Sequence, residues 1–260
     1  MLTRRINRFA WLVKHHGAIE ACRDFIFRII ACLSIKNIVL PIYESIDGLN
    51  HPVCMRSNTS DSAVFAQIFK QNEYSSIRDI KDVKLIIDCG GYTGLSALWF
   101  LNNYPDARVI VIEPDIRNYL ILRKNLKFYR DRVLMLNAAV WPYDARLAIA
   151  KGDSHWATKV KEVGIVDKQE IESVSVGRLV DESGLGRVDI LKIDIEGSEE
   201  KLFVEDCKKW LQKVRNIAIE LHGKICEEAF FSAMSDYRYE LSRIGDIVVL
   251  KNIIPKKPNA

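Results

Sequence analysis

The sequence predicts a doubly wound α/β domain that begins near residue 82, and two observations carry this prediction. From Val83 onward, short apolar runs alternate with segments of helical periodicity. The first of these runs leads into a glycine-rich turn that opens a helix. Strands separated by helices imply right-handed crossovers and a mostly parallel sheet, with helices on both faces.

The order of elements follows from these patterns. We expect strands at 84–88, 108–113, 133–140, 188–194 and 216–221. Helices are expected at 93–103, 116–129, 199–211 and 226–235. A closing hairpin, 239–244 and 247–251 joined across Gly245-Asp246, would add one antiparallel strand at or near the sheet edge.

Residues 1–81 form an expected extension that packs on this domain. Basic amphipathic helices occupy 4–35, and a hairpin of 38–43 with 52–56 turns at Asp47-Gly48. Ser60-Asp61 is a candidate helix N-cap. The basic helices have two interpretations: a face packed on the domain, or a contact with a membrane surface or with a second copy in a homodimer.

An insertion at 141–187 interrupts the alternation. Short β signals at 147–150 and 174–176 flank a polar stretch, 152–170. A long segment of this kind in a compact domain is usually functional or mobile. His155 and Trp156 lie on it and could form a lid that stacks on a sugar, or simply belong to a solvated loop.

Composition narrows the classes of function and compartment. A net charge of +4, without an arginine-rich run or zinc-finger spacing, argues against a nucleic-acid partner. Six cysteines without a C-x-x-C pair fit a reduced, cytoplasmic setting, and no signal peptide is evident. The apolar stretch 25–42 is interrupted by Arg28, Lys36 and Pro41, so we expect no transmembrane segment, although a cytoplasmic protein with peripheral membrane contact stays open.

The glycine-rich turn is the first candidate site. Asp88 ends the first strand, and Gly90, Gly91 and Gly94 follow, the position where α/β sheets bind nucleotides. The turn is not a P-loop, and Tyr92 departs from G-x-G-x-x-G. A carboxylate at this point would repel a pyrophosphate but suits the sulfonium and ammonium groups of S-adenosylmethionine.

Acidic and imidazole groups end the other strands. Glu113 ends the second strand, where an acid can accept hydrogen bonds from both ribose hydroxyls. Asp194 and Glu196 follow the strand 188–194, and His222 follows the neighbouring one. Parallel strands end at one edge, so Asp194 and His222 should converge on the acceptor and supply a base. Capping of the next helix is the structural alternative for Glu196.

These stretches together resemble the FkbM-type methyltransferases. The resemblance rests on Asp88–Gly94, Glu113-Pro114, Asn137-Ala138-Ala139, the run from Lys192 to Gly197, and Glu220-Leu221-His222. The upstream run from Arg56 to Asp61, with Gln67-Ile68-Phe69 and Glu73-Tyr74, is similar to the family's lead-in.

The resemblance implies a class I, Rossmann-like methyltransferase with a seven-stranded sheet and S-adenosylmethionine as cofactor. By matched position, Asp88 and the turn glycines form the cofactor loop, Glu113 with Pro114 meets the ribose, and Asn137, Ala138 and Ala139 lie near adenine. The lead-in adds Ser60 and Asp61 to the cofactor residues. The family often has Asn where this chain has Tyr92, which puts the local cofactor contacts in question.

The leading hypothesis is an O-methyltransferase that acts on a hydroxyl of a sugar, a glycan or a glycosylated small molecule. Asp194, His222 and Glu196 are its candidate catalytic residues, and no metal is assigned. Three alternatives stay open: a metal-assisted O- or N-methyltransferase with Asp194, Glu196 and His222 as ligands, an inactive binding protein that keeps the fold, and, disfavoured by Tyr92, a nicotinamide-dependent oxidoreductase.

Overall fold

The computed structural model describes residues 39–46, 48–49, 51–151, 158–162, 170–204 and 207–256, and four single positions before them (13, 14, 18 and 22). The chain divides into two compact units, Met1–Ala66 and Gln67–Ala260, which are treated separately. The basic helices expected at 4–35, and His155 with Trp156, lie outside the described residues.

The first unit contains the predicted hairpin. Strand β1 (Pro41–Glu44) pairs antiparallel with β2 (Val53–Arg56), and helix α2 (Asp61–Phe65) follows. The Asp61 carboxylate is buried and accepts hydrogen bonds from the Arg56 backbone N–H at 2.7 Å and from its guanidinium at 2.9 and 3.0 Å. Ser60 lies at the N-cap position but makes no side-chain cap bond. Asp61 therefore ties the end of the hairpin to the first turn of α2.

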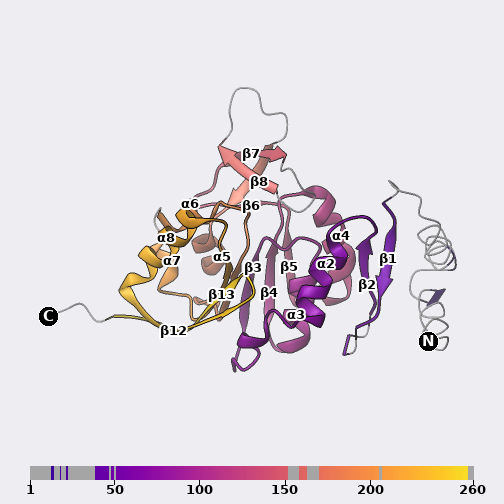
Figure 1. Ribbon diagram of the computed structural model, residues 1–260, viewed down its shortest axis with the longest axis horizontal. Coiled ribbons are helices and arrows are strands. Elements are labelled where there is room, and N and C mark those ends of the chain that lie inside the picture. The colour runs from indigo at the N-terminus through magenta and orange to yellow at the C-terminus, as the bar shows by residue number, and fades with distance from the viewer. Residues whose placement is uncertain are drawn as a thin grey trace. The chain divides into compact units, whose positions relative to one another are not determined.

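The second unit is built on a seven-stranded, mostly parallel sheet, as predicted (Figure 1). Its strand order is β12-β13-β11-β10-β3-β4-β5. Only β13 runs antiparallel to both of its neighbours, β11 and β12, so the closing hairpin adds one reversed strand next to the edge. The strands are β3 (Leu85–Cys89), β4 (Arg108–Ile112), β5 (Val133–Leu136), β10 (Ile190–Ile193), β11 (Ile217–Glu220), β12 (Tyr237–Ile244) and β13 (Ile247–Pro255).

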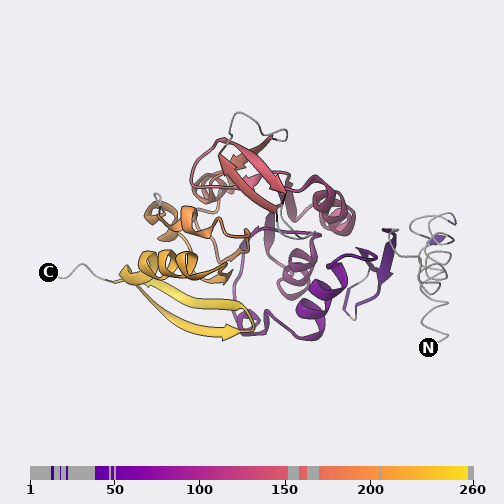
Figure 2. The ribbon, with the colours of Figure 1, turned by 45° about the horizontal axis from the view of Figure 1, so that its top comes forward.

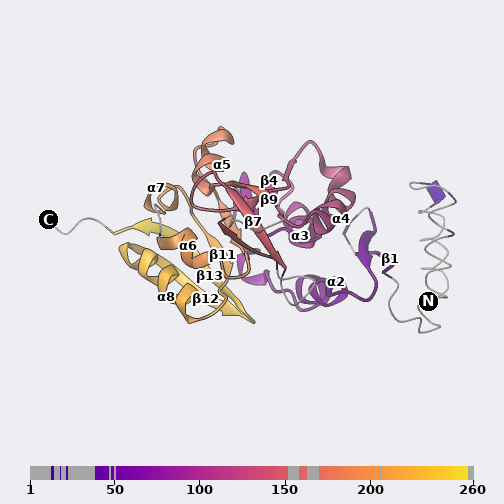
Figure 3. The ribbon, with the colours of Figure 1, turned by 90° about the horizontal axis from the view of Figure 1, so that it is seen from above.

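Helices connect the strands and cover the sheet. On one side of β3 the chain continues to β4 and β5, and on the other side lie β10 and β11. Because such crossovers are right-handed, α3 and α4 lie on one face of the sheet and α5 to α8 on the other. Figures 2 and 3 show the two groups of helices apart. Every side chain of β3 and β10 is buried, as expected for central parallel strands. The helices are η1 (Ala66–Lys70, a π-helix across the unit boundary), η2 (Ser75–Ile77), α3 (Leu95–Asn103), α4 (Ile116–Leu126), η3 (Lys127–Tyr129), α5 (Val176–Glu182), α6 (Glu199–Val204), α7 (Lys208–Leu211), α8 (Lys224–Ala233) and η4 (Met234–Asp236).

The predicted strand 133–140 is wrong as a single element. It divides into β5 and the two-residue β6 (Ala139–Val140), which belongs to a different sheet. The side-chain amide of Asn137, between them, donates to the backbone carbonyls of Glu113 and Pro114 at 2.9 and 3.1 Å. The chain therefore leaves the main sheet at Asn137. The predicted helix 199–211 likewise divides into α6 and α7.

The insertion forms a second, four-stranded sheet above the carboxyl end of β5 (Figure 1). Its order is β6-β9-β7-β8, with β7 at Arg146–Lys151, β8 at Thr158–Glu162 and β9 at Glu170–Val174. Trp141 and Leu147 form its small core with Ala139. The predicted β signal at 147–150 lies within β7. The one at 174–176 is wrong beyond Val174, because β9 ends there and helix α5 begins at Val176, and β8 was not predicted.

In the described part of the chain, no helix is long and apolar enough to cross a membrane. Most of the interrupted apolar stretch 25–42 lies outside that part.

Candidate active site

The glycine turn after β3 is held by the protein's own backbone. Gly90 and Gly91 both donate to the carbonyl of Ile112, at 3.0 and 2.8 Å. A Cβ on Gly90, whose φ is +83°, would lie 1.7 Å from the carbonyl oxygen of Asp194, and one on Gly91 would lie 2.2 Å from Val111 Cγ1. We expected these glycines to admit a ligand, but their first role is to let the turn lie directly against β10 and β4.

Asp88 faces a lysine inside the protein. Its carboxylate is fully buried, accepts a hydrogen bond from Ser96 Oγ at 2.5 Å, and lies 3.3 Å from Lys192 Nζ. Lys192 also donates to the Gly90 carbonyl at 2.6 Å. Burial raises the pKa of Asp88, with Lys192 and Ser96 opposing it. Burial also disfavours the Lys192 charge, but Asp88 and Asp194 outweigh it and raise the lysine pKa well above its usual value. The Asp88–Lys192 ion pair therefore holds the glycine turn in position from inside the protein.

Glu113 lies beside the same turn, directly after β4. Its Oε2 accepts from the Tyr92 backbone N–H at 2.8 Å, and its Oε1 from the Asp115 N–H at 2.9 Å and the Asn118 amide at 3.2 Å. Burial raises the pKa of Glu113 to about 8, against these three hydrogen bonds. A carboxylate offers roughly four lone-pair sites, so it retains capacity for a ribose hydroxyl. Tyr92 reaches Glu113 with a φ of +48°, a conformation that Asn adopts more readily.

The other residues predicted to contact the cofactor fall in two places. Asn137 bonds the carbonyls of Glu113 and Pro114, and Ala138 and Ala139 follow directly, with Ala139 buried. These residues therefore lie together at the carboxyl ends of β4 and β5. Ser60 and Asp61 belong to the first unit, where the Asp61 carboxylate is bound to Arg56.

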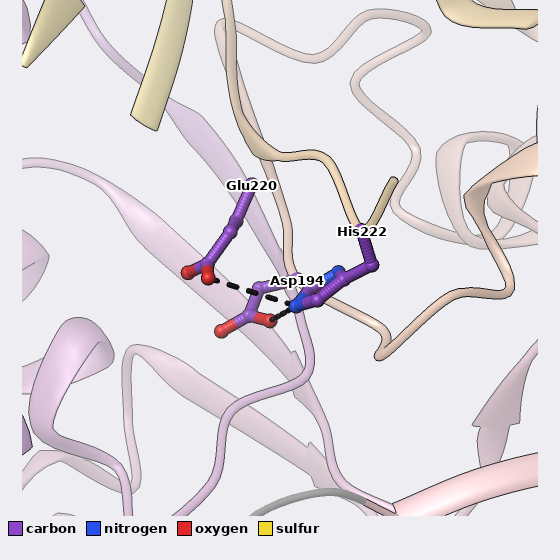
Figure 4. A group of neighbouring side chains, drawn as sticks. All are labelled: Asp194, Glu220 and His222. Carbon is purple, nitrogen blue, oxygen red and sulfur yellow. Dashed lines mark ion pairs between the residues drawn. The ribbon is translucent and has the colours of Figure 1, made fainter. Parts of the chain in front are cut away.

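The predicted catalytic residues meet at the adjoining strand ends (Figure 4). Strands β10 and β11 are parallel neighbours, with Ile193 opposite Ile219, so Asp194, Glu220 and His222 end at one edge. His222 Nε2 lies 3.6 Å from Glu220 Oε1, 3.7 Å from Glu196 Oε2 and 3.9 Å from Asp194 Oδ1. The cluster therefore contains the predicted Asp194, Glu196 and His222 together with Glu220, which was not predicted.

A buried carboxylate orients the His222 ring. Glu199, the first residue of α6, is fully buried and places Oε1 3.0 Å from His222 Nδ1, where it also accepts from the Ile195 N–H at 3.1 Å. The bond to Glu199 and the charges of Asp194 and Glu196, against burial, raise the pKa of His222 to about 9. The imidazole is therefore protonated at neutral pH and, in this state, cannot accept a proton.

Two further carboxyl groups titrate near neutrality at this edge. Burial and the charge of Asp194 raise the pKa of Glu196 to about 7, and Glu196 lies in a left-handed turn with a φ of +56°. Burial and the charge of Glu220 raise the pKa of Glu73 to about 7. Sequence reasoning missed four contributors, Glu73, Lys192, Glu199 and Glu220, as site residues. Glu220 had the same signal as Glu113, an acid at the end of a buried strand, whereas nothing in the spacing marks Glu73.

This site fits S-adenosylmethionine on the chemistry of its acceptors. Glu113 keeps acceptor capacity beside the turn, and the carboxyl ends of β3, β4 and β10 meet around that turn. An acid at the second strand end, next to a glycine turn of a mostly parallel sheet, is an arrangement that binds the ribose of a nucleotide cofactor, and S-adenosylmethionine carries such a ribose.

Comparisons with known proteins give the family. Residues 88–247 match the family described as methyltransferase FkbM domain, and the chain belongs to this family. Two curated relatives are each 26% identical: "Methyltransferase 1" of Beauveria bassiana, over 61% of this chain and 72% of that protein, and "Methyltransferase sdnD" of Sordaria araneosa, over 60% and 73%. A methyltransferase structure from Geobacter sulfurreducens is 16% identical with a TM-score of 0.42, covering 86% of this chain and 95% of that one.

Proposed function

We propose that the protein transfers the methyl group of S-adenosylmethionine to a hydroxyl group of a sugar, a glycan or a glycosylated small molecule. The observation that carries this proposal is the set of carboxylates around His222. Within the described residues, no hydrogen-bond donor reaches the carboxylate of Asp194, Glu196 or Glu220; only Lys192 and His222 lie within ion-pair distance. Carboxylates accept hydrogen bonds, so they suit a ligand that carries several hydroxyl groups.

The chemistry requires that the acceptor lose a proton. The bound cofactor supplies a methyl group on a sulfonium, which is already a strong electrophile. A sugar hydroxyl is a poor nucleophile until its proton leaves, so the protein must orient that hydroxyl and take the proton. Glu196, half-buried and with a pKa of about 7, has the proton affinity that suits a base at neutral pH.

The remaining residues are assigned roles from their contacts. Asp194 orients the acceptor hydroxyl, and His222 holds the carboxylates together at one point. Glu113 accepts from the ribose hydroxyls, and Asn137 with Ala138 and Ala139 lies near adenine. Asp88 and Lys192 keep the glycine turn in position rather than contacting the acceptor.

The test is transfer of a labelled methyl group to a panel of glycans, glycosides and amines. We expect label in the sugar hydroxyls, and Glu196→Gln should lower turnover ~10²–10⁴-fold with S-adenosylhomocysteine affinity retained. Glu228→Gln, an exposed acid on α8 with 66% of its side chain accessible, is the matched control and should match the wild type. Label that enters only amines would contradict the proposed acceptor class.

A further inference from the structure

We infer that Asp194, Glu220 and His222 form a binding site for a divalent first-row metal ion such as Mn²⁺. One ligand atom from each side chain can be chosen so that all three lie within 4.8 Å of one another, on two neighbouring strand ends (Figure 4). The role assigned to the ion in catalysis rests on the proposed function, whereas its binding does not.

The distances suit a common ion. Two ligands that each lie ~2.1 Å from a metal ion are at most ~4.2 Å apart. His222 Nε2 lies 3.6 Å from Glu220 Oε1 and 3.9 Å from Asp194 Oδ1, inside this limit. All three side chains are partly exposed, so small rotations can bring the carboxylates closer.

The imidazole is held as a metal-binding histidine requires. Glu199 lies outside the ligand set, is fully buried, and bonds Nδ1, which leaves Nε2 directed at the carboxylates. A metal-ligating histidine characteristically bonds a carboxylate or carbonyl through its other nitrogen, which fixes the ring and its tautomer. The Ile195 N–H holds the same Glu199 oxygen, so this orientation does not depend on the ligands.

At this edge of the sheet, the carboxylates of the described residues outnumber the cationic groups, so the cluster can accept a cation. Asp194, Glu196 and Glu220 gather around His222 without a hydrogen-bond donor from the described residues, and the Lys192 ammonium is shared with the buried Asp88. Carboxylates held this close repel one another strongly in a half-buried setting. A divalent ion bound among these side chains would balance the charge of two of the carboxylates.

The ligand types select the ion and its role. One imidazole nitrogen with two carboxylates favours Mn²⁺, Fe²⁺ or Zn²⁺ over Mg²⁺ and Ca²⁺, which prefer oxygen ligands alone. An acceptor hydroxyl bound to the ion would become more acidic. Its O–H bond then breaks with the proton passing to Glu196, a new C–O bond forms, and the sulfur–methyl bond breaks with its electron pair left on sulfur. No group is oxidised or reduced.

The experiment measures binding of Mn²⁺ to the chelator-treated, full-length protein by calorimetry, with S-adenosylhomocysteine titrated into the same samples. We expect the wild type to bind Mn²⁺ more tightly than Mg²⁺. Glu220→Gln and His222→Gln should each weaken Mn²⁺ binding at least tenfold, and Glu199→Gln ~10–100-fold, because it acts through the ring orientation. Glu228→Gln should bind Mn²⁺ as the wild type does.

Retained S-adenosylhomocysteine affinity in each variant shows that the protein is folded and its cofactor site intact. The metal site is wrong if the wild-type protein binds S-adenosylhomocysteine but binds Mn²⁺ no better than Glu220→Gln and His222→Gln do. The carboxylates would then be expected to bind a cationic group of the acceptor. Mn²⁺ binding that depends on Glu220, in a protein that methylates only amines, would instead contradict the proposed acceptor and leave the metal site standing.

Discussion

The two ends of strand β10 carry aspartates with opposite surroundings. Asp189, before the strand, is buried: its Oδ2 accepts from the Lys84 and Leu85 N–H groups at 2.7 and 3.1 Å, and Arg187 lies 3.2 Å from Oδ1. Asp194, after the strand, is about one third exposed, and among the described residues it has only ion-pair neighbours. The backbone and an arginine hold Asp189 in place, whereas Asp194 has no hydrogen-bond donor among the described residues.

The two ends of β10 also differ in the charges of the residues around them. Next to Asp189 lies a cavity of about 240 Å³ that is lined by both signs of charge, including Asp79 and Lys251, which pair at 2.9 Å. Around Asp194 the carboxylates outnumber the cations. The two ends of β10 therefore differ in charge balance as well as in burial.

The sharpest test of this comparison replaces Asp194, at the end of β10, by asparagine. Asp194→Asn should lower turnover ~10²–10⁴-fold, because it removes a charge that orients the acceptor, while S-adenosylhomocysteine binding and thermal stability change little. Steady-state kinetics beside calorimetry would measure this. Wild-type turnover would remove Asp194 from the catalytic residues.

Glu113 combines both kinds of surroundings, with backbone partners and capacity for a ligand. Glu113→Ala should weaken S-adenosylhomocysteine binding by about 1–3 kcal/mol, because the hydrogen bond to the ribose is lost. Calorimetry at matched protein stability would measure it. Unchanged affinity would mean that Glu113 only supports the turn.

Asp189→Asn is the counterpart at the supporting end. It should lower the free energy of unfolding by about 1–3 kcal/mol, since the Lys84 and Leu85 N–H groups lose a charged acceptor, and leave turnover of the folded enzyme unchanged. Urea unfolding beside kinetics would check it. A catalytic defect without a loss of stability would break the contrast between the two ends.

The last test concerns the dependence of stability on pH. Because the folded protein holds the Glu113 proton up to about pH 8, against 4.5 for the ordinary group, it binds more protons than the unfolded chain between these values. The free energy of unfolding should therefore fall as pH rises through this window, and part of the slope should be absent in Glu113→Gln. Urea unfolding at several pH values would measure both slopes, and equal slopes would contradict the raised pKa.

The sequence predicted the strand ends well because buried parallel strands are continuous apolar runs, and the acid that follows such a run is visible. Asp194, Glu113 and His222 were found in this way. The break at Asn137 was not, because it depends on an amide reaching carbonyls 23 and 24 positions earlier. Glu199 was read as the start of a helix, and only the tertiary structure turns it toward His222, 23 positions later.

The contact between Gly90 and Asp194 has a consequence for how this enzyme can change. The Asp194 N–H donates to the Cys89 carbonyl at 3.0 Å, and its own carbonyl occupies the space where any side chain on residue 90 would begin. The cofactor turn and the acceptor acid are thus one rigid piece, and neither can be moved without the other. Under the proposed function, changes that admit new acceptors are therefore expected away from this contact, in the four-stranded insertion.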